Sequence, residues 1–277
     1  MFRLTSKLHN TSSWYTEDFD IPAYLRALSV EPAPASYELL AQLHRAHVET
    51  FPFTNVDVVL EMHPGINPST AQDQLMNKNR GGYCFEHAQI FAAAAEYLGF
   101  EVRRHLGRVK SLNLSRTHMS VVVTVDGTDY LCDPGFGFSI YEPVELRDGA
   151  TGVSVGQTFT LEQGVDGSTE TWSLTRKGEV EHIVDMAPFR PEDARTGHFL
   201  LSADPASVFK NHLMYMRHFG DHHLTVTERP VTVRREGQQT EQREVSALQA
   251  ARKIQQLGLN VSDDEVRRIA DLFRDKE

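Results

Sequence analysis

The chain changes character near residue 100, and this change limits the folds that it can adopt. Between residues 20 and 99, apolar residues recur at helical spacing, as Leu39, Leu40 and Leu43 do. Between about residues 102 and 184, short β-branched runs alternate with turn signals, a pattern typical of an antiparallel meander or a small barrel. Helices followed by strands and a mixed tail predict an α+β protein with three lobes.

Three helical segments are expected in the first part of the chain. Residues 20–50 are predicted to be helical, with the Pro-rich EPAPAS segment as a break and a cap. A second helix is expected from Ser69, with Gln72 completing a capping box, and it should end before Arg80. A third is expected from about Cys84 to Leu98.

Turn signals divide the second part, and helices return near the C-terminus. The expected turns are Asp126-Gly127, Gly152, Asp166-Gly167 and Lys177-Gly178. Two prolines suggest that 187–200 is a connector. The tail is predicted to begin with a mixed stretch over His212–Phe219, followed by a β-ribbon over Leu224–Val226 and Val231–Arg234. Two helices are expected after the ribbon, over Ser246–Leu257 and Ser262–Phe273. The second of these helices opens with a capping box formed by Ser262 and Glu265.

Composition narrows the class of protein. With 277 residues, a formal charge of −10 and a pI of about 5.7, the chain does not resemble a non-specific nucleic-acid binder, which would be basic. Residues 1–16 are expected to be an irregular lead-in without an apolar signal segment. The most apolar stretch, IFAAAAEYLGF, is too short to span a membrane. Two cysteines cannot form a disulfide scaffold or a four-cysteine zinc site, so we expect free thiols in a cytoplasmic protein.

Cys84 is the first candidate for chemistry. It follows Arg80-Gly-Gly-Tyr and opens the third helix. The partial positive charge of a helix N-terminus favours a thiolate, so the pKa of this cysteine is expected to be lowered. Taken alone, Cys84 fits a buried structural cysteine better than a nucleophile, because cysteine is among the most buried residue types.

A hairpin supplies the candidate partners of Cys84. If Asp126-Gly127 forms the turn, residues whose numbers sum to 253 face each other, so Ser120 faces Asp133. His118 lies two residues from Ser120 and therefore points to the same face of the sheet as Asp133. The register thus predicts an imidazole beside a carboxylate, able to act on a nearby thiol as base and orienting group.

These residues resemble those of the arylamine N-acetyltransferase family over most of residues 20–140, and weakly beyond. Four motifs occur in the family's order: Leu43-His-Arg-Ala-His47 with Pro52-Phe53-Thr54-Asn55, then Arg80-Gly-Gly-Tyr-Cys84-Phe-Glu, Arg116-Thr-His118, and Tyr130-Leu-Cys-Asp133-Pro-Gly-Phe-Gly137. The resemblance implies a helical bundle over residues 1–99 that carries the nucleophile, a β-barrel over 100–195 that carries His and Asp, and an α/β lid over 196–277. The Cys-His-Asp core would resemble that of cysteine proteases.

The resemblance also implies the reaction. Cys84 would take an acetyl group from acetyl-CoA and pass it to an aromatic amine, hydrazine or N-hydroxyarylamine, with His118 as base and then acid, as in xenobiotic metabolism. Phe53 would line the acceptor pocket, and Thr117, Phe136 and Gly137 would lie near the acetyl donor. No metal and no permanently bound cofactor are implied, and the preferred amine, the acyl chain and the oligomeric state are left open.

Two positions depart from the family pattern. The family usually has Glu where this chain has Thr54, and that Glu pairs with the Arg of the nucleophile motif. Arg80, a structural support, is therefore expected to use another acceptor, Glu49 or Glu86. Pro134 lacks the N–H usual at its position and so removes one donor beside Asp133.

Four further features have simpler interpretations. The basic run of Arg103, Arg104, Arg108 and Lys110 is expected to be a solvated strand face, with contact to CoA phosphates as the alternative. His212, His218, His222 and His223 fit no standard zinc spacing. Of His44 and His47, one is expected to face the core as a hydrogen-bonding residue. Cys132 should point to the opposite face from Asp133 and be inert.

Three other functions share parts of this pattern. A macrolactam-forming amide synthase would use a related triad, and a thiol hydrolase or transglutaminase-like enzyme would share the Cys-His-Asp order. A sensor that binds CoA or aromatic compounds would keep the residues without the reaction. The nature of the acyl group accepted by Cys84 separates these alternatives.

Overall fold

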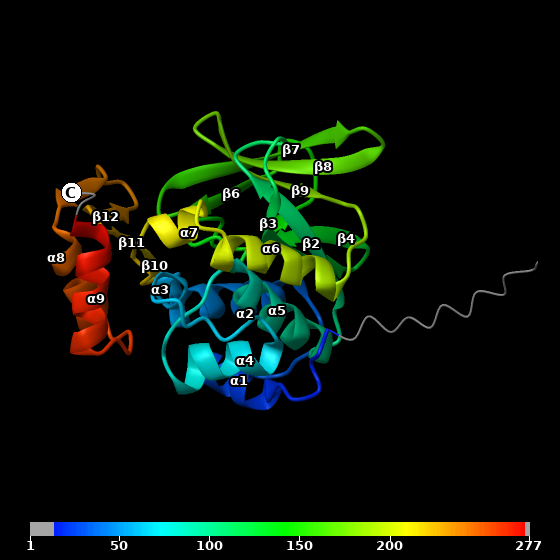
Figure 1. Ribbon diagram of the computed structural model, residues 1–277. Coiled ribbons are helices and arrows are strands. Elements are labelled where there is room, and N and C mark those ends of the chain that lie inside the picture. The colour runs from blue at the N-terminus through cyan, green and yellow to red at the C-terminus, as the bar shows by residue number, and fades with distance from the viewer. Residues whose placement is uncertain (1–13, 275–277) are drawn as a thin grey trace, which may run out of the picture.

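The helical first part of the chain packs beneath a β-barrel in the computed structural model, which describes residues 14–274 (Figure 1). Its elements are α1 (Ile21–Leu28), α2 (Tyr37–Thr50), β1 (Phe53–Thr54), α3 (Val56–Val59), α4 (Pro68–Gln72), the π-helical turn η1 (Asp73–Asn77) and α5 (Cys84–Tyr97). Most of the predicted lead-in, residues 1–13, lies outside the described residues, and residues 14–16 form neither helix nor strand. No helix within residues 14–274 combines the length and the apolar character needed to cross a membrane.

Local capping explains where the helices begin. Ser36 caps α2, and its hydroxyl accepts from the Leu39 N–H at 3.3 Å, which confirms the predicted cap. The predicted Ser69/Gln72 capping box is wrong, because α4 begins at Pro68. The Gln72 amide instead bonds both backbone groups of Asp20, at 2.9 and 3.1 Å, and so ties α4 to the start of α1.

Helix α5 is buried over almost its whole length, from Cys84 to Ala95. Most of these residues are apolar, and the buried polar residues Glu86, His87 and Gln89 lie in the first two turns, so the helix must be covered on all sides. In this fold it is enclosed by the other N-terminal helices and by the barrel strands β2 and β3 (Figure 1). The first residue of the helix, Cys84, is thereby held in a fixed position against the barrel.

The barrel is one antiparallel sheet of eight strands in the order β5-β4-β3-β2-β9-β8-β7-β6. The strands are β2 (Glu101–Val109), β3 (Arg116–Val125), β4 (Thr128–Cys132), β5 (Val144–Glu145), β6 (Thr151–Ser154), β7 (Gln157–Asp166), β8 (Thr169–Arg176) and β9 (Glu179–Asp185). The two edges nearly close, since the Tyr141 N–H donates to the Val153 carbonyl at 3.4 Å beside β5 and β6. Of the predicted turns, Gly152 is wrong: it lies within β6, and Val155-Gly156, both at positive φ, make that turn.

The β3–β4 hairpin has the predicted register. Val125 pairs with Thr128 and Val122 pairs with Leu131, as the sum of 253 requires. Asp126 and Gly127 have φ of 49° and 79°, the left-handed values that a tight two-residue hairpin turn needs.

A second antiparallel sheet, in the order β1-β10-β11-β12-β13, joins the C-terminal part of the chain to β1. It comprises β10 (Met214–His218), β11 (His222–Thr227), β12 (Pro230–Arg235) and β13 (Glu241–Glu244), and its flanking helices are α6 (Pro191–Ala203), α7 (Val208–Asn211), α8 (Ala247–Gln256) and α9 (Asp263–Phe273). The predicted connector over 187–200 is wrong from Pro191 onward, because this proline occupies the first turn of α6, where a missing N–H costs nothing.

The predicted C-terminal elements are otherwise confirmed. The β11–β12 ribbon has the expected strands, and α8 and α9 begin after capping boxes at Ser246 and Ser262. Helices α8 and α9 stand beside the small sheet, at the left edge of the molecule in Figure 1. Their apolar faces bury Ile254, Ile269 and Phe273 against this sheet and α3.

Candidate active site

Cys84 lies at the point where α5 meets the barrel. Its side chain is buried, and its Sγ donates to the Thr117 carbonyl at 3.5 Å. Gly135 covers it from the other side, where a Cβ would lie 2.7 Å from the Cα of Cys84. Only glycine permits this approach, which brings the segment after Asp133 against the first turn of the helix.

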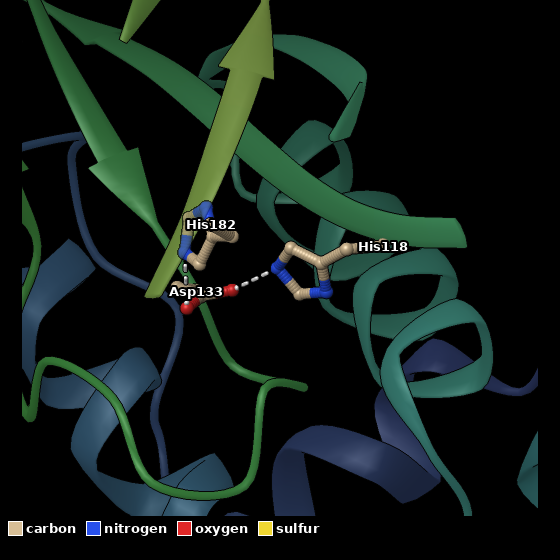
Figure 2. A group of neighbouring side chains, drawn as sticks. All are labelled: His118, Asp133 and His182. Carbon is tan, nitrogen blue, oxygen red and sulfur yellow. Dashed lines mark hydrogen bonds and ion pairs between the residues drawn. The ribbon is translucent and has the colours of Figure 1, made fainter. Parts of the chain in front are cut away.

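His118 and Asp133 are side by side, as the hairpin register predicts (Figure 2). His118 Nε2 lies 2.7 Å from Asp133 Oδ1, and both side chains are almost fully buried. Because Nε2 faces the carboxylate, it carries the proton, and Nδ1 keeps the basic lone pair. Nδ1 has no hydrogen-bond partner within residues 14–274.

The Asp133 carboxylate has more donors than the sequence analysis anticipated. His182 Nε2, from β9, donates to Oδ2 at 3.0 Å (Figure 2). The hydroxyl of Ser139 also donates to Oδ2, and that of Ser120 donates to Oδ1 at 3.3 Å. Side-chain donors therefore surround the carboxylate, although Pro134 contributes no N–H.

The backbone of Asp133 is fixed as well. Its N–H donates to His44 Nε2 at 3.1 Å, and His44 Nδ1 donates to the Tyr141 carbonyl at 3.1 Å. His47 bonds Tyr24 and His87, at 2.6 and 2.7 Å. Both His44 and His47 are buried, so the expectation that one of them faces the core understates their role.

Burial dominates the protonation of Cys84. Burial raises the pKa of the thiol, Glu86 and Asp133 raise it further, and backbone N–H groups of Met119 and Phe85 only partly oppose them. The expected lowering of this pKa by the helix N-terminus is therefore wrong for the unliganded site. The site holds a neutral thiol.

The two partners of the thiol shift in ways that suit a neutral base on a fixed carboxylate. Burial lowers the pKa of His118, and the attraction of Asp133 offsets this only in part. Burial alone would raise the pKa of Asp133, but His118 and His182 outweigh it and hold this pKa well below its usual range. At neutral pH the arrangement is a neutral imidazole on an ionised carboxylate.

Cys84 and His118 line one cavity of about 710 Å³. Thr117, Phe53 and Phe136 line it too, as the family resemblance implies. The other apolar lining residues are Val109, Leu114, Phe138, Leu200, Leu201, Ala206, Val208, Phe209, Met214 and Met216. Gly137 is not among the lining residues but packs against one of them: it has a φ of 93°, and a Cβ at this position would lie 2.6 Å from Met216 Sδ.

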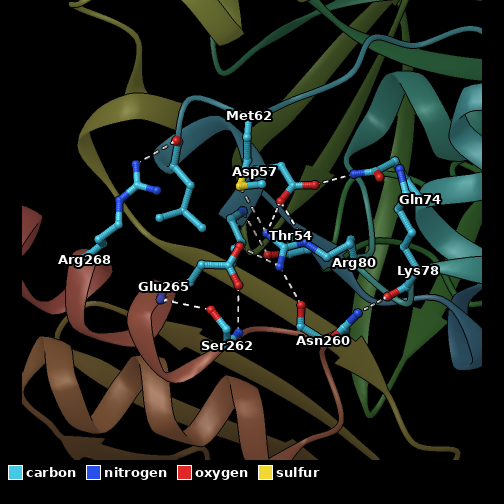
Figure 3. Close-up of polar contacts among 12 residues, drawn as sticks. Thr54, Asp57, Met62, Gln74, Lys78, Arg80, Asn260, Ser262, Glu265 and Arg268 are labelled. Atoms are coloured by element: carbon cyan, nitrogen blue, oxygen red, sulfur yellow. Dashed lines mark hydrogen bonds and ion pairs between the residues drawn. The ribbon is translucent and has the colours of Figure 1, made fainter.

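Arg80 finds partners that the sequence analysis did not anticipate (Figure 3). Its Nε donates to Asp57 Oδ1 at 2.9 Å, and its Nη1 reaches Glu265 Oε1 at 3.0 Å. The expected partners, Glu49 and Glu86, are wrong. Glu49 accepts from the Tyr141 hydroxyl, and Glu86 pairs with His63 at 2.6 Å.

The network of Arg80 spans the molecule. Asp57 belongs to α3, and Gln74 of η1 donates to its second oxygen. Glu265 belongs to α9, and the Asn260 carbonyl before that helix accepts from Arg80 at 2.5 Å (Figure 3). One guanidinium therefore connects the loop before Cys84 to α3 and to the C-terminal helix α9.

The four residues of the basic run between Arg103 and Lys110 have different surroundings in the structure. Arg103 is half-exposed and pairs with Asp129, but Arg104 pairs with Glu96 and only 2% of its side chain is exposed. The expectation of a solvated face is therefore wrong for Arg104. Only Lys110 of this run lines the cavity.

The other residues singled out by the sequence have structural contacts. His212 pairs with Glu228 and His222 pairs with Asp221, each at 2.7 Å. His223 donates to the Gly137 carbonyl at 3.0 Å, and His218 packs against the ring of His223. Cys132 is fully buried, and burial raises the pKa of its thiol well above the usual value.

Comparison with known proteins identifies the family. A family model described as N-acetyltransferase matches residues 36–266. The chain is 31% identical over 256 residues to the arylamine N-acetyltransferase / N-hydroxyarylamine O-acetyltransferase of Salmonella typhimurium, covering 87% of this chain and 89% of the relative. The chain belongs to the arylamine N-acetyltransferase family. As a member of the family, the protein is an acyltransferase.

Solved structures agree with this family assignment. The arylamine N-acetyltransferase of Nocardia farcinica is 28% identical and superposes with a TM-score of 0.84, covering 93% of this chain and 95% of that one. The enzyme of Mycobacterium marinum, solved in complex with CoA, superposes with a TM-score of 0.81 at 23% identity, covering 91% and 99%. These family structures confirm the predicted α+β fold.

Proposed function

We propose that Cys84, His118 and Asp133 are a catalytic triad that transfers an acetyl group from acetyl-CoA to an aromatic amine, hydrazine or N-hydroxyarylamine. The observation that carries the proposal is the 2.7 Å contact of His118 Nε2 with Asp133, which leaves Nδ1 available as a base, in a residue that lines the same cavity as Cys84. The names of the relatives and the CoA complex of the M. marinum enzyme support acetyl-CoA and an arylamine as substrates.

The first half-reaction acetylates the enzyme. The Cys84 sulfur attacks the thioester carbon while its proton passes to His118 Nδ1. The bond between that carbon and the CoA sulfur then breaks, and His118 returns the proton to the departing CoA thiolate. Because burial raises the pKa of the free thiol, Cys84 needs His118 as a base to give up its proton.

The second half-reaction uses the same groups in reverse. The amine nitrogen attacks the acetyl carbon and gives a proton to His118, and the Cys84 sulfur departs and takes that proton back. Asp133 stabilises the imidazolium formed in each half. The backbone N–H of Cys84, in the first turn of α5, has no acceptor within the helix and is the candidate donor to the oxyanion.

The walls of the cavity favour an aromatic acceptor. Phe53 and Phe136 flank the site, and the ring of Phe136 lies 5.0 Å from that of His118. We propose Phe53 as part of the acceptor pocket, and Thr117, Phe136 and Gly137 as residues near the acetyl donor. Phenylalanine rings beside Cys84 and His118 offer faces and edges against which an aromatic ligand packs favourably.

The remaining parts of the chain have supporting roles in this proposal. Residues 1–99 would form the unit that presents Cys84, residues 100–195 the unit that presents His118 and Asp133, and residues 196–277 the lid. Arg80 would hold the nucleophile loop against this lid. The mechanism needs Cys84 as a free thiol, which suits the reducing cytoplasm and a role in the metabolism of foreign aromatic amines.

Steady-state kinetics test the proposed reaction. With acetyl-CoA and an arylamine varied together, an acetyl-enzyme route gives parallel double-reciprocal lines. Cys84→Ala should abolish CoA release, while Cys132→Ala should keep the wild-type rate per folded molecule. Intersecting lines, or a substantial residual rate in Cys84→Ala, would exclude the mechanism.

A further inference from the structure

Five charged side chains line the Cys84 cavity. Its lining includes three cationic residues, Lys110, Arg176 and Arg234, and two carboxylates, Glu181 and Asp204. The rest of the wall is mostly apolar. In such surroundings a charge is stable only when it is paired.

Glu181 is already shared by two of the cations. Lys110 Nζ lies 2.6 Å from Oε2, and Arg176 Nη2 lies 2.6 Å from Oε1. Both oxygens of this carboxylate therefore have a cationic partner. The Asp204 carboxylate makes a local contact, since it accepts a hydrogen bond from the backbone N–H of Ala206 at 2.8 Å.

Arg234 has no carboxylate partner within residues 14–274. Its Nη1 donates to the Thr225 hydroxyl at 3.0 Å, and the guanidinium lies 4.5 Å from the centre of the Phe138 ring. Arg176 lies 5.3 Å from the centre of the same ring. Burial lowers the pKa of Arg234, and the nearby charge of Arg176 lowers it further.

We propose that Arg234, with Arg176 beside it, binds an anionic group of a substrate that occupies the Cys84 cavity. Both guanidinium groups lie over the Phe138 ring, and a guanidinium has several N–H donors that suit a carboxylate or a phosphate. The bound anion supplies the charge that Glu181 cannot, since that carboxylate is already used. This inference rests on the proposed function, because it concerns substrates of Cys84.

The anion has two possible sources, and kinetics distinguish them. It can be a carboxylate on the aromatic amine, or a phosphate of the acyl donor. In a two-step reaction, kcat/KM for the acceptor reports only the second half-reaction, and kcat/KM for the donor reports only the first. If the anion belongs to the amine, loss of Arg234 changes kcat/KM for the acceptor, and if it belongs to the acyl donor, the loss changes kcat/KM for the donor.

The experiment compares Arg234→Gln with the wild type on matched substrates. The acceptors are 4-aminobenzoate and its neutral methyl ester, and the donors are acetyl-CoA and S-acetylpantetheine. We expect Arg234→Gln to lower kcat/KM by about tenfold or more for the anionic member of one pair, since hydrogen bonds to charged groups have this strength. The neutral member should change less than twofold, and Arg234→Lys should recover part of the loss.

The controls separate this inference from the proposed function. Arg103→Gln removes an exposed guanidinium outside the cavity and should leave both pairs unchanged. Each ratio is taken within one variant, so it does not depend on the fraction of folded protein. If Arg234→Gln changes the anionic and neutral members equally, the anion site is excluded. If the wild type acetylates no acceptor at all, the proposed function fails instead.

Discussion

His182 Nε2 lies 3.0 Å from Asp133 Oδ2, the carboxylate oxygen that His118 does not contact. One carboxylate is therefore held between two imidazoles from different strands. His182 Nδ1 is buried and has no hydrogen-bond partner within residues 14–274. These contacts suit His182 to a positioning role for His118 and Asp133, the pair proposed to act on Cys84.

Replacing His182 tests this positioning role. His182→Phe removes one donor from a buried carboxylate and should slow single-turnover acetylation of Cys84 by about tenfold, since bonds to charged groups contribute about 1.5–3 kcal/mol. His182→Gln can still donate to Asp133 and should recover most of that rate. A phenylalanine variant that acetylates as fast as the wild type would contradict the role.

The Arg80 network predicts a large difference between buried and exposed ion pairs. Asp57→Ala leaves a buried guanidinium without its main partner and should lower the free energy of unfolding by about 3 kcal/mol. Glu145→Ala breaks the exposed pair with Arg147 and should cost less than about 1 kcal/mol. Urea unfolding measures both, and equal losses would contradict the structure.

Buried histidines predict a loss of stability in mild acid. The pKa values of His44, His87 and His198 are lowered to about 4, and that of His218 to about 3, chiefly by burial. Below pH 6.5 these histidines bind protons in the unfolded chain but stay neutral in the folded protein. The free energy of unfolding therefore falls as pH falls from 6.5 towards 4. Each group contributes about 1.4 kcal/mol per pH unit.

His218→Phe isolates one of these groups, because His218 packs between aromatic rings. The variant should lose about 2 kcal/mol less than the wild type between pH 6.5 and pH 5. Urea unfolding at the two pH values provides the measurement. Identical pH dependence in the two proteins would show that His218 is not held neutral by the fold.

The reaction is expected to be independent of metal ions. Ligand atoms of His118, Asp133 and His182 lie within 4.8 Å of one another, a grouping that could also hold a metal ion. In the proposed mechanism their contacts are hydrogen bonds that orient a base, so dialysis against EDTA should leave kcat unchanged. Loss of activity that added zinc restores would contradict this mechanism.

The parts of the site that are local in sequence could be predicted from it. A two-residue turn fixes the register of its own hairpin, so the contact between His118 and Asp133 follows from counting residues. The start of α5 at Cys84 likewise depends on neighbouring residues. For the same reason Ser262 and Glu265 could be predicted as a capping box.

Contacts that depend on the closure of the fold could not be predicted in this way. His182 reaches Asp133 only because β9 pairs with β2 and the barrel curves, and the one local signal is that His182 shares a face of its strand with the apolar residues Val180 and Val184. Arg80 meets Glu265 through the packing of α9, 185 residues farther along the chain. The expected partners, Glu49 and Glu86, are nearer to Arg80 in the sequence than Glu265 is, but they are engaged elsewhere.

The most direct test of the central claim is the intact mass of the protein after brief exposure to acetyl-CoA without an acceptor. The account predicts an increase of about 42 Da, the mass of one acetyl group, located on Cys84 by peptide mapping and removed when an arylamine is added. The Cys84→Ala variant should show no such increase. An unmodified wild-type protein, or an acetyl group on any other residue, would contradict the account.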